Sequence, residues 1–226
     1  MRDVSVTTVP DSAELEQISA RLEVGPAGDT VRWAVETFGD GLVLAASFQD
    51  CVLIDIATTV APGIEVAFLD TQYHFPETLE FVETVRDRYD LNLRVLQPTA
   101  EPDELWKTDT DACCAVRKVE TLRRALDGKS AWMSGLRRCE APSRADAPVV
   151  SWDVARGLVK VNPIVTWTDD DVAAYSADRD LPEHPLRAAG YTSIGCWPCT
   201  KPVTNGGDAR AGRWADSDKL ECGLHV

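Results

Sequence analysis

The sequence alternates between short apolar runs and longer helical patterns, and this alternation limits the fold more than any other feature. The apolar runs lie at Leu42–Ala46, Glu65–Leu69, Leu93–Leu96 and Ala131–Ser134. Runs of this length are typical of buried strands. A helical pattern separates the second run from the third, from Pro76 to about Tyr89, with proline suitably in its first turn. Strands alternating with helices predict an α/β fold, a twisted parallel sheet with flanking helices.

The remaining segments predict three parts of the chain. Residues 1–40 carry N-terminal helices, two of them over 11–37 with a break at the glycines of 25–28. Residues 41–205 form the α/β core, which also holds a helix over 112–126, an antiparallel strand pair at 149–152 and 158–161, and a helix that starts near Thr168. Residues 206–226 form a C-terminal tail, rich in glycine and charge, that we expect to be mobile.

Three small or polar residues follow predicted strands directly, namely Ser47, Asp70 and Gly135. The carboxyl ends of parallel strands share one edge of a sheet, and ligands bind there in open α/β folds. The sequence therefore predicts a ligand site along this edge.

The charge balance excludes some functions. The chain has 23 basic and 37 acidic residues, a net charge of −14, which makes nucleic acid an unfavourable partner. An anionic small molecule would need locally concentrated cations, and the candidates are Arg137, Arg138 and Arg144, with Arg210 and Arg213. No apolar run is long enough to span a membrane, and the N-terminal residues lack the apolar centre of a signal peptide. We therefore expect a cytoplasmic protein; its oligomeric state, a homo-oligomer included, stays open.

Four of the seven cysteines form two pairs, Cys113–Cys114 and Cys196–Cys199. Four thiolates suit a zinc ion or an iron–sulfur cluster, and the C-x-x-C pair alone could be a redox dithiol. Adjacent side chains on a helix diverge by about 100°, which is awkward for a single ion and favours a cluster. Lys118 lies one helical turn after Cys114 and places a cation on the same face.

A further cysteine, Cys222, lies near the end of the sequence, in the predicted tail. A thiol on a mobile segment can react at one site and be discharged at another, and nearby positive charge favours its reactive thiolate. His225 is a candidate for that charge or for a substrate contact. Cys51 is interpreted as a buried apolar residue, and no role is assigned to Cys139.

Seven motifs, in this order along the chain, resemble the assimilatory adenylyl-sulfate reductases, close relatives of the phosphoadenylyl-sulfate reductases. The resemblance runs from about Gly41 to the C-terminus. The motifs are ASF (46–48), LDTQYHFPET (69–78), CCAVRKVETL (113–122), SGLRR (134–138), IGCWPCT (194–200), RAGRW (210–214) and ECGLH (221–225).

The resemblance implies an adenine-nucleotide alpha-hydrolase-like fold, related to the PP-loop enzymes. It implies a 4Fe–4S cluster on Cys113, Cys114, Cys196 and Cys199 with Lys118 nearby, and Cys222 as the catalytic nucleophile. It also implies thioredoxin-dependent reduction of adenylyl sulfate to sulfite and AMP through an S-sulfocysteine. The residues expected to contact the substrate are Ser47, Phe48, Leu69, Arg137, Arg138, Arg210, Arg213 and His225.

The sequence departs from the family pattern at three places. Thr121 replaces a frequent proline, Ala215 follows Trp214 where some members carry further tryptophans, and CEAPSRAD at 139–146 differs from the common pattern after SGLRR. The third departure leaves the phosphosulfate contacts open.

Three other functions are compatible with parts of the sequence. The same reaction on 3′-phosphoadenylyl sulfate would need one more basic contact. An ATP pyrophosphatase should carry a glycine-rich SGGxDS-like loop where this chain reads ASFQD (46–50). A non-catalytic iron–sulfur or zinc redox sensor would explain the paired cysteines but not Cys222 or the arginines.

Overall fold

The structure is a computed structural model that describes residues 10–203, 210–214, 219 and 221–225. Within these residues the sheet has six strands, in the order β3-β2-β1-β4-β6-β5. All neighbours are parallel except β5, which pairs antiparallel with β6 at one edge. The strands are β1 (Leu42–Ala46), β2 (Glu65–Leu69), β3 (Asn92–Leu96), β4 (Ala131–Ser134), β5 (Val150–Asp153) and β6 (Leu158–Val161).

The strand order reverses between β1 and β4. The chain adds β2 and β3 on one side of β1 and then returns to place β4 on the other side. In doubly wound sheets the crevice at such a reversal is where ligands bind. The topology thus selects the carboxyl ends of β1 and β4 as the place to look for a site.

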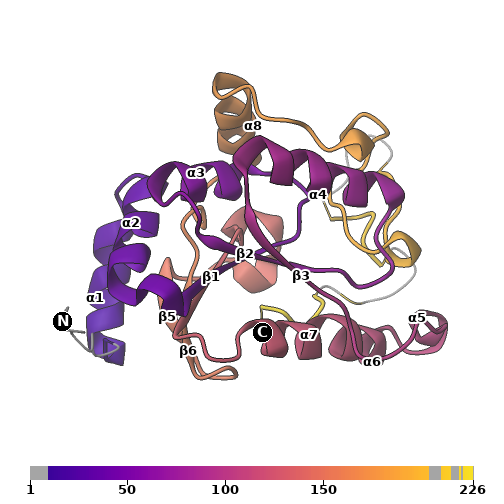
Figure 1. The fold of residues 1–226 in the computed structure, drawn as a ribbon, viewed down its shortest axis with the longest axis horizontal. Helices are drawn as coiled ribbons and strands as arrows, with labels where there is room; N and C mark the ends of the chain where they lie inside the picture. Colours follow the sequence, from indigo (N-terminus) through magenta and orange to yellow (C-terminus); the bar gives the residue numbers. More distant parts are fainter. Residues whose placement is uncertain (1–9, 204–209, 215–218, 220, 226) are drawn as a thin grey trace.

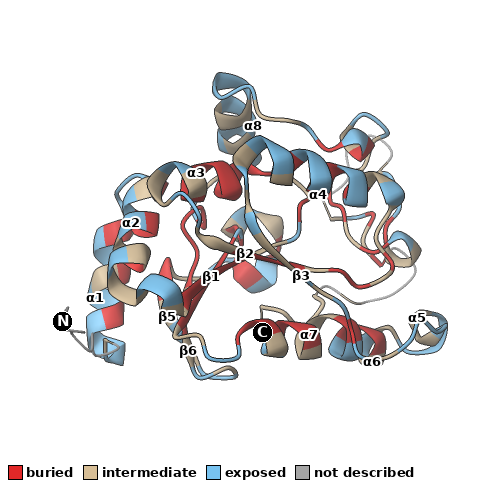
Figure 2. Ribbon diagram, viewed as in Figure 1, coloured by how far each residue is buried: buried red, intermediate tan, exposed pale blue. Residues whose placement is uncertain are grey.

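Helices cover both faces of the sheet (Figure 1). On one face lie α3 (Val52–Val60) and α4 (Pro76–Tyr89), and on the other lie α6 (Thr110–Cys114) and α7 (Glu120–Ala125). The side chains of β1 alternate accordingly, because Leu42 and Leu44 pack into the larger core and Val43 into the smaller one. Figure 2 shows the buried residues along the strands and on the helix surfaces that face them.

The remaining helices extend these layers. Of the N-terminal helices, α1 (Ser12–Glu23) packs against β5 and α2 (Ala27–Phe38) packs against α3. The last helix, α8 (Asp169–Asp178), begins at Thr168 with a capping box and contacts α3. No helix in the described part of the chain is long and apolar enough to cross a membrane.

A network of hydrogen bonds joins α8 to α3 and α4. The buried carboxylate of Asp55 accepts hydrogen bonds from Tyr89 Oη at 3.0 Å and Tyr175 Oη at 2.7 Å, and from Arg179 Nε at 3.2 Å. Three elements therefore share one buried acceptor, which compensates for taking the carboxylate out of water.

The predicted α/β class and parallel sheet are confirmed, as are the antiparallel pair and the helices near 11–37, 76–89 and 169. The helix predicted over 112–126 runs instead from Thr110 to Ala125 and is interrupted by a π-helical turn, Ala115–Val119. The sequence analysis also missed the short helix α5 (Leu105–Thr108).

Candidate active site

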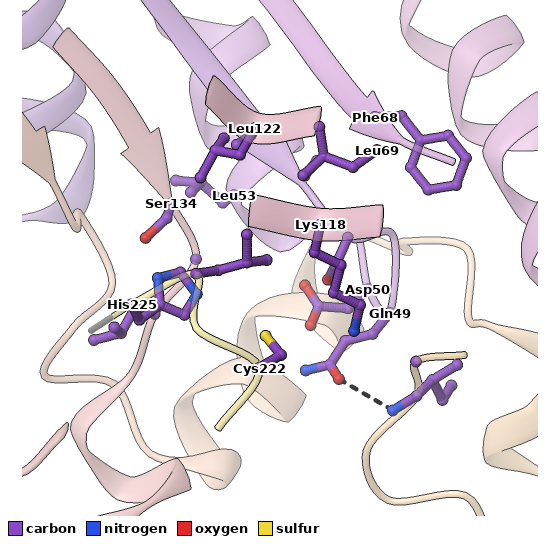
Figure 3. Close-up of a pocket in the computed structure, with 18 of the residues that line it drawn as sticks. Gln49, Asp50, Leu53, Phe68, Leu69, Lys118, Leu122, Ser134, Cys222 and His225 are labelled. Atoms are coloured by element: carbon purple, nitrogen blue, oxygen red, sulfur yellow. Dashed lines mark hydrogen bonds between the residues drawn. The ribbon is translucent and has the colours of Figure 1, made fainter. Parts of the chain in front are cut away.

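A cavity of about 190 Å³ opens at the carboxyl ends of β1, β2 and β4 (Figure 3). The residues that line it include the strand ends and the loops that follow them, the π-helical turn with α7, and the tail. Leu53 and Ile54 of α3, Arg144 and the 194–195 segment complete the wall. Of the residues from which a site was predicted at this edge, Ser47 and Gly135 line the cavity, and Thr71 lines it where Asp70 was expected.

The loop after β1 is shaped by a strained residue. Phe48 has φ 55°, a left-handed conformation that bulky residues rarely adopt. Its ring is buried against Phe68, with centroids 5.3 Å apart, and it does not line the cavity. The turn directs its neighbours inward instead, and Gln49 Oε1 accepts a hydrogen bond from Ile194 N at 3.2 Å.

The last residue of β2, Leu69, and Thr71 and His74 from the segment after it contribute to the wall. His74 Nε2 lies 3.0 Å from the carbonyl oxygen of Leu69. Burial lowers the pKa of His74 to about 4 and outweighs that hydrogen bond. The imidazole is therefore neutral at physiological pH, and Nε2 donates to the carbonyl.

The segment after β4 separates into residues that face the cavity and residues that do not. Ser134 and Gly135 line it, and Ser134 Oγ is bonded to Asn162 Oδ1 at 2.8 Å. The two predicted arginines lie outside its wall, where Arg137 pairs with Asp169 at 2.8 Å and Arg138 with Glu23 at 2.6 Å. Their pairing with acids from distant segments explains why the structure does not bring them to the cavity.

Four other cations line the cavity, namely Lys118, Arg144, Arg210 and Arg213. Arg213 reaches it by crossing Gly195, where a Cβ atom would overlap the guanidinium group. Its Nη1 lies 3.4 Å from Ser193 Oγ. The close approach explains glycine at 195, and the same holds at Gly212, where a Cβ would overlap the Lys201 carbonyl.

The described tail residues, 221–225, are docked in the cavity. Cys222 and Lys118 both face it (Figure 3). On one side of Cys222, Glu221 forms an ion pair with Arg144 at 2.6 Å, and on the other the carbonyl of Gly223 accepts from Arg156 at 3.3 Å. The His225 ring stacks parallel to Trp132, with centroids 5.9 Å apart. Leu224 packs beside Trp132 against the smaller core, which Leu122 and Ala125 of α7 also form.

The charges favour a thiolate at Cys222. Burial raises its pKa, but Lys118, the backbone N–H of Leu224 and Arg213 lower it by more, so that the pKa of Cys222 falls below its usual value. Burial in turn lowers the pKa of Lys118, yet Cys196, Cys222 and Cys114 raise it overall. A cation and a thiolate thus stabilise each other in the cavity wall.

His225 cannot supply a positive charge to Cys222. Its burial and the nearby Lys160 and Arg144 lower the pKa of His225 far below its usual value. The ring is therefore neutral, and the charge expected of it comes from Lys118 and Arg213.

The four paired cysteines line one small cavity beside the first. Cys113 and Cys114 come from α6, and Cys196 and Cys199 come from a short turn whose backbone pairs with His74. Burial and the neighbouring thiols raise the pKa of Cys113 to about 11. The residues that share this wall with them are Tyr73, Trp106, Thr110, Arg117, Lys118, Pro198 and Trp214.

Lys118 lines both cavities. Its neighbour in the π-helical turn, Arg117, is buried, lines the smaller cavity and donates to Gln72 Oε1 at 2.8 Å. Such turns often occur at functional sites. Among the described residues, no group of three or more His, Cys, Asp or Glu side chains is placed to hold a single metal ion.

The remaining cysteines lie elsewhere. Cys51 is buried, as predicted, and burial raises its pKa to about 12. Cys139 is exposed, and its thiol lies 3.3 Å from the carbonyl oxygen of Trp167.

Comparisons with known proteins find relatives that align with nearly the whole chain. A model of the phosphoadenosine phosphosulfate reductase domain matches residues 41–202. Adenosine 5′-phosphosulfate reductase of Mycolicibacterium smegmatis is 46% identical over 100% of both chains. The protein of that name from Streptomyces coelicolor is 45% identical and aligns with 97% of this chain and 96% of its own length.

Solved structures share the fold. Phosphoadenylyl-sulfate reductase of Candida auris, crystallised as a phosphate complex, superposes with a TM-score of 0.76 at 26% identity, over 87% of this chain and 100% of that one. An FMN adenylyltransferase of Candida glabrata, 15% identical, superposes with a TM-score of 0.59 over 95% of this chain and 79% of its own. The second likeness concerns the fold alone.

Proposed function

The chain belongs to the phosphoadenosine phosphosulfate reductase family, and we propose that it reduces adenylyl sulfate to sulfite and AMP with Cys222 as the nucleophile. The observation that carries this proposal is the meeting of Cys222 with Lys118, Arg144, Arg210 and Arg213 in one cavity at the strand reversal. A thiolate in a cationic pocket suits nucleophilic attack on an anionic substrate.

We assign a part of the cavity to each part of the substrate. We propose that the nucleoside lies along Ser47 and Leu69, at the ends of β1 and β2, and that the phosphosulfate faces the four cations. Arginine suits this task because its planar guanidinium donates two parallel hydrogen bonds to an oxyanion. The same donors stabilise the charge that develops on the leaving phosphate.

The reaction divides into two displacements at sulfur. The Cys222 thiolate attacks the sulfonyl sulfur, the bond from that sulfur to the phosphate oxygen breaks, and AMP leaves with the electron pair. Cys222 then carries an S-sulfonate. A dithiol, for which we propose thioredoxin, attacks Cys222 Sγ with one thiolate and releases sulfite. Its second thiol resolves the mixed disulfide, so that the dithiol is oxidised by two electrons and Cys222 is regenerated.

We propose that the four paired cysteines hold a 4Fe–4S cluster. Four thiols on two segments line a single cavity with aromatic walls, which fits a cluster that several thiolates anchor. When bound, the cluster supplies electrostatic field beside the cavity rather than the electrons of the reaction. Lys118, which lines both cavities, would then separate its charge from the Cys222 thiolate.

Adenylyl sulfate is favoured over its 3′-phosphorylated form for two reasons. The full-length relatives at 45–46% identity carry that substrate in their names, and the paired cysteines resemble those of enzymes that use the unphosphorylated nucleotide. Thiolate ligands and dithiol exchange both require a reducing compartment, so we place the reaction in the cytoplasm.

The covalent step is tested by intact-mass spectrometry. Anaerobically purified protein mixed with adenylyl sulfate, without a dithiol, should gain the mass of one sulfonate on the peptide that contains Cys222. Thioredoxin should remove that mass and release sulfite. Cys222→Ser should gain no mass, and adduct formation in this variant would refute the assignment of the nucleophile.

The cluster is tested separately by metal analysis. The purified protein should contain iron and acid-labile sulfide, and Cys113→Ser or Cys199→Ser should lose both. Zinc in place of iron and sulfide would contradict the cluster.

A further inference from the structure

The carboxylate next to the nucleophile is held by arginines of the cavity. Glu221 precedes Cys222 directly, and its oxygens accept from Arg144 Nε at 2.6 Å and Arg144 Nη2 at 2.8 Å. Ser143 Oγ donates to the same carboxylate at 3.1 Å, and Arg210 Nη2 lies 3.5 Å away. Both partners of the main pair are nearly out of contact with water, with side-chain exposures of 7% for Arg144 and 10% for Glu221.

This pairing uses the edge of Arg144 that a substrate oxyanion would need. A guanidinium grips a planar or tetrahedral oxyanion best through two parallel N–H groups. On Arg144, Nε and Nη2 already donate to Glu221, and Nη1 donates to Glu140. Since Arg144 and Arg210 both line the cavity, Glu221 offers them the same two-oxygen acceptor that a phosphate or sulfonate group offers.

We propose that Glu221 is a latch, a tail carboxylate that occupies part of the anion site and must give way when the phosphosulfate binds. This inference rests on the proposed function, because it assumes that the ligand of these arginines is a sulfonucleotide. Tail docking and anion binding then compete for Arg144 and Arg210. Each substrate molecule that takes these arginines releases the residue beside Cys222, while Gly223 and His225 keep their contacts with Arg156 and Trp132.

The latch explains why a fixed and buried carboxylate lies next to a nucleophile that attacks an anion. A carboxylate there would repel the substrate if its only role were structural. As a competitor for the arginines it holds the tail in place until the substrate arrives. Glu221 is thus a positioning residue, since it acts on Cys222 through the tail and on the substrate through the arginines.

The competition predicts that removing the charge of Glu221 tightens anion binding. In a Cys222→Ser background, which prevents turnover, Glu221→Gln should bind adenylyl sulfate about three- to tenfold more tightly by calorimetry, the size expected for one hydrogen bond gained net. Its affinity for adenosine, which has no anionic group, should not change. A purely structural role predicts weaker binding of both ligands.

The same latch predicts a looser tail. In the chain that retains Cys222, Glu221→Gln should increase several-fold the rate at which a bulky maleimide alkylates Cys222. Peptide mass spectrometry measures this rate. Glu140→Gln is the matched control, because Glu140 also pairs with Arg144 but does not lie on the tail. It should leave the maleimide rate unchanged, and Glu221→Asp, which keeps the charge, should fall between Glu221→Gln and the unsubstituted chain.

The outcomes separate the latch from the proposed function. If Glu221→Gln weakens adenylyl sulfate binding, or leaves both affinity and alkylation unchanged with an unchanged melting temperature, the latch is refuted while the reductase stands. If the Cys222→Ser protein binds adenylyl sulfate no more tightly than adenosine, the proposed function itself is refuted, and the latch falls with it.

Discussion

The reactivity of Cys222 depends on a few side chains around it. Burial alone would raise the pKa of Cys222 and leave a neutral thiol, but Lys118 and Arg213 reverse the direction of the shift. Lys118 stays charged for the reciprocal reason, since nearby thiolates outweigh its burial. Burial keeps His225 neutral, so this residue packs on Trp132 and adds no positive charge beside Cys222.

Lys118→Gln should therefore raise the pKa of Cys222. The substitution removes the largest charge that favours the thiolate, so burial then dominates and the midpoint of alkylation moves to higher pH. The measurement is the rate of Cys222 alkylation by iodoacetamide as a function of pH, with Lys107→Gln as the control, because Lys107 is bonded to Glu104 away from the cavity. An unchanged midpoint in Lys118→Gln would show that Lys118 does not set the ionisation of Cys222.

The arginines show what a sequence can and cannot predict about single side chains. Arg210 and Arg213, which were predicted as substrate contacts, line the cavity. Arg137 and Arg138 do not, because Asp169 and Glu23 hold them elsewhere. Those acids are far away in the sequence, so the direction of each arginine depends on the fold. Arg144, which lines the cavity, was named as a candidate cation but was not among the residues expected to contact the substrate.

Among the loops and helices, the segments that form the site are held by close backbone approaches. Arg213 crosses Gly195, and the Arg210–Trp214 segment pairs with the turn that carries Cys199 through the bridge between Thr200 and Arg213. One arginine and two cysteines are thereby fixed by the same piece of structure. This coupling explains why the IGCWPCT and RAGRW motifs occur together.

Gly195→Ala should weaken catalysis without unfolding the protein. The new Cβ displaces the Arg213 guanidinium, and a displaced substrate-binding group lowers kcat/KM by about tenfold or more. Steady-state sulfite release measures the effect, and circular dichroism checks the fold. Gly28→Ala, whose Cβ would have an ordinary contact 3.7 Å from Val60, is the control and should keep full activity. Equal activity of both variants would show that Arg213 does not take part in substrate binding.

Asp55→Ala should destabilise the packing of α8 on α3 and α4. The change leaves the hydroxyls of Tyr89 and Tyr175 without their acceptor, and the free energy of unfolding should fall by about 1–3 kcal/mol. Urea unfolding followed by far-UV circular dichroism measures it. Tyr175→Phe removes one hydrogen bond and should cost about 1 kcal/mol. A loss in Asp55→Ala no larger than that in Tyr175→Phe would contradict the shared network.

The elements themselves were predictable to different degrees. Buried parallel strands are nearly continuous apolar runs, so β1, β2 and β4 were predicted with their observed ends. The edge strand β3, which has no buried residue, was predicted within one residue. The order of the strands was not predicted, because it depends on contacts between distant segments. The π-helical turn has no sequence pattern of its own, and α5, with four residues, is too short to show a period.

At the scale of the whole molecule, a net charge of −14 repels an anionic substrate. The fold resolves the conflict by gathering Lys118, Arg144, Arg210 and Arg213 from distant parts of the chain into one cavity. The tail, predicted as a mobile segment, is docked there over residues 221–225 through an ion pair and a ring stack. Its docking could not be predicted, because Glu221 and His225 look like ordinary polar residues near a chain end.

Sulfite release by anaerobically purified protein, with thioredoxin and its reductant, tests the central claim most directly. Adenylyl sulfate and its 3′-phosphorylated form are compared in the unsubstituted chain and in Cys222→Ser. The proposed function predicts rapid sulfite release from adenylyl sulfate, slow or no release from the phosphorylated nucleotide, and none from either in Cys222→Ser. Release that persists in Cys222→Ser, or no release from either nucleotide by protein that contains iron and sulfide, would contradict it.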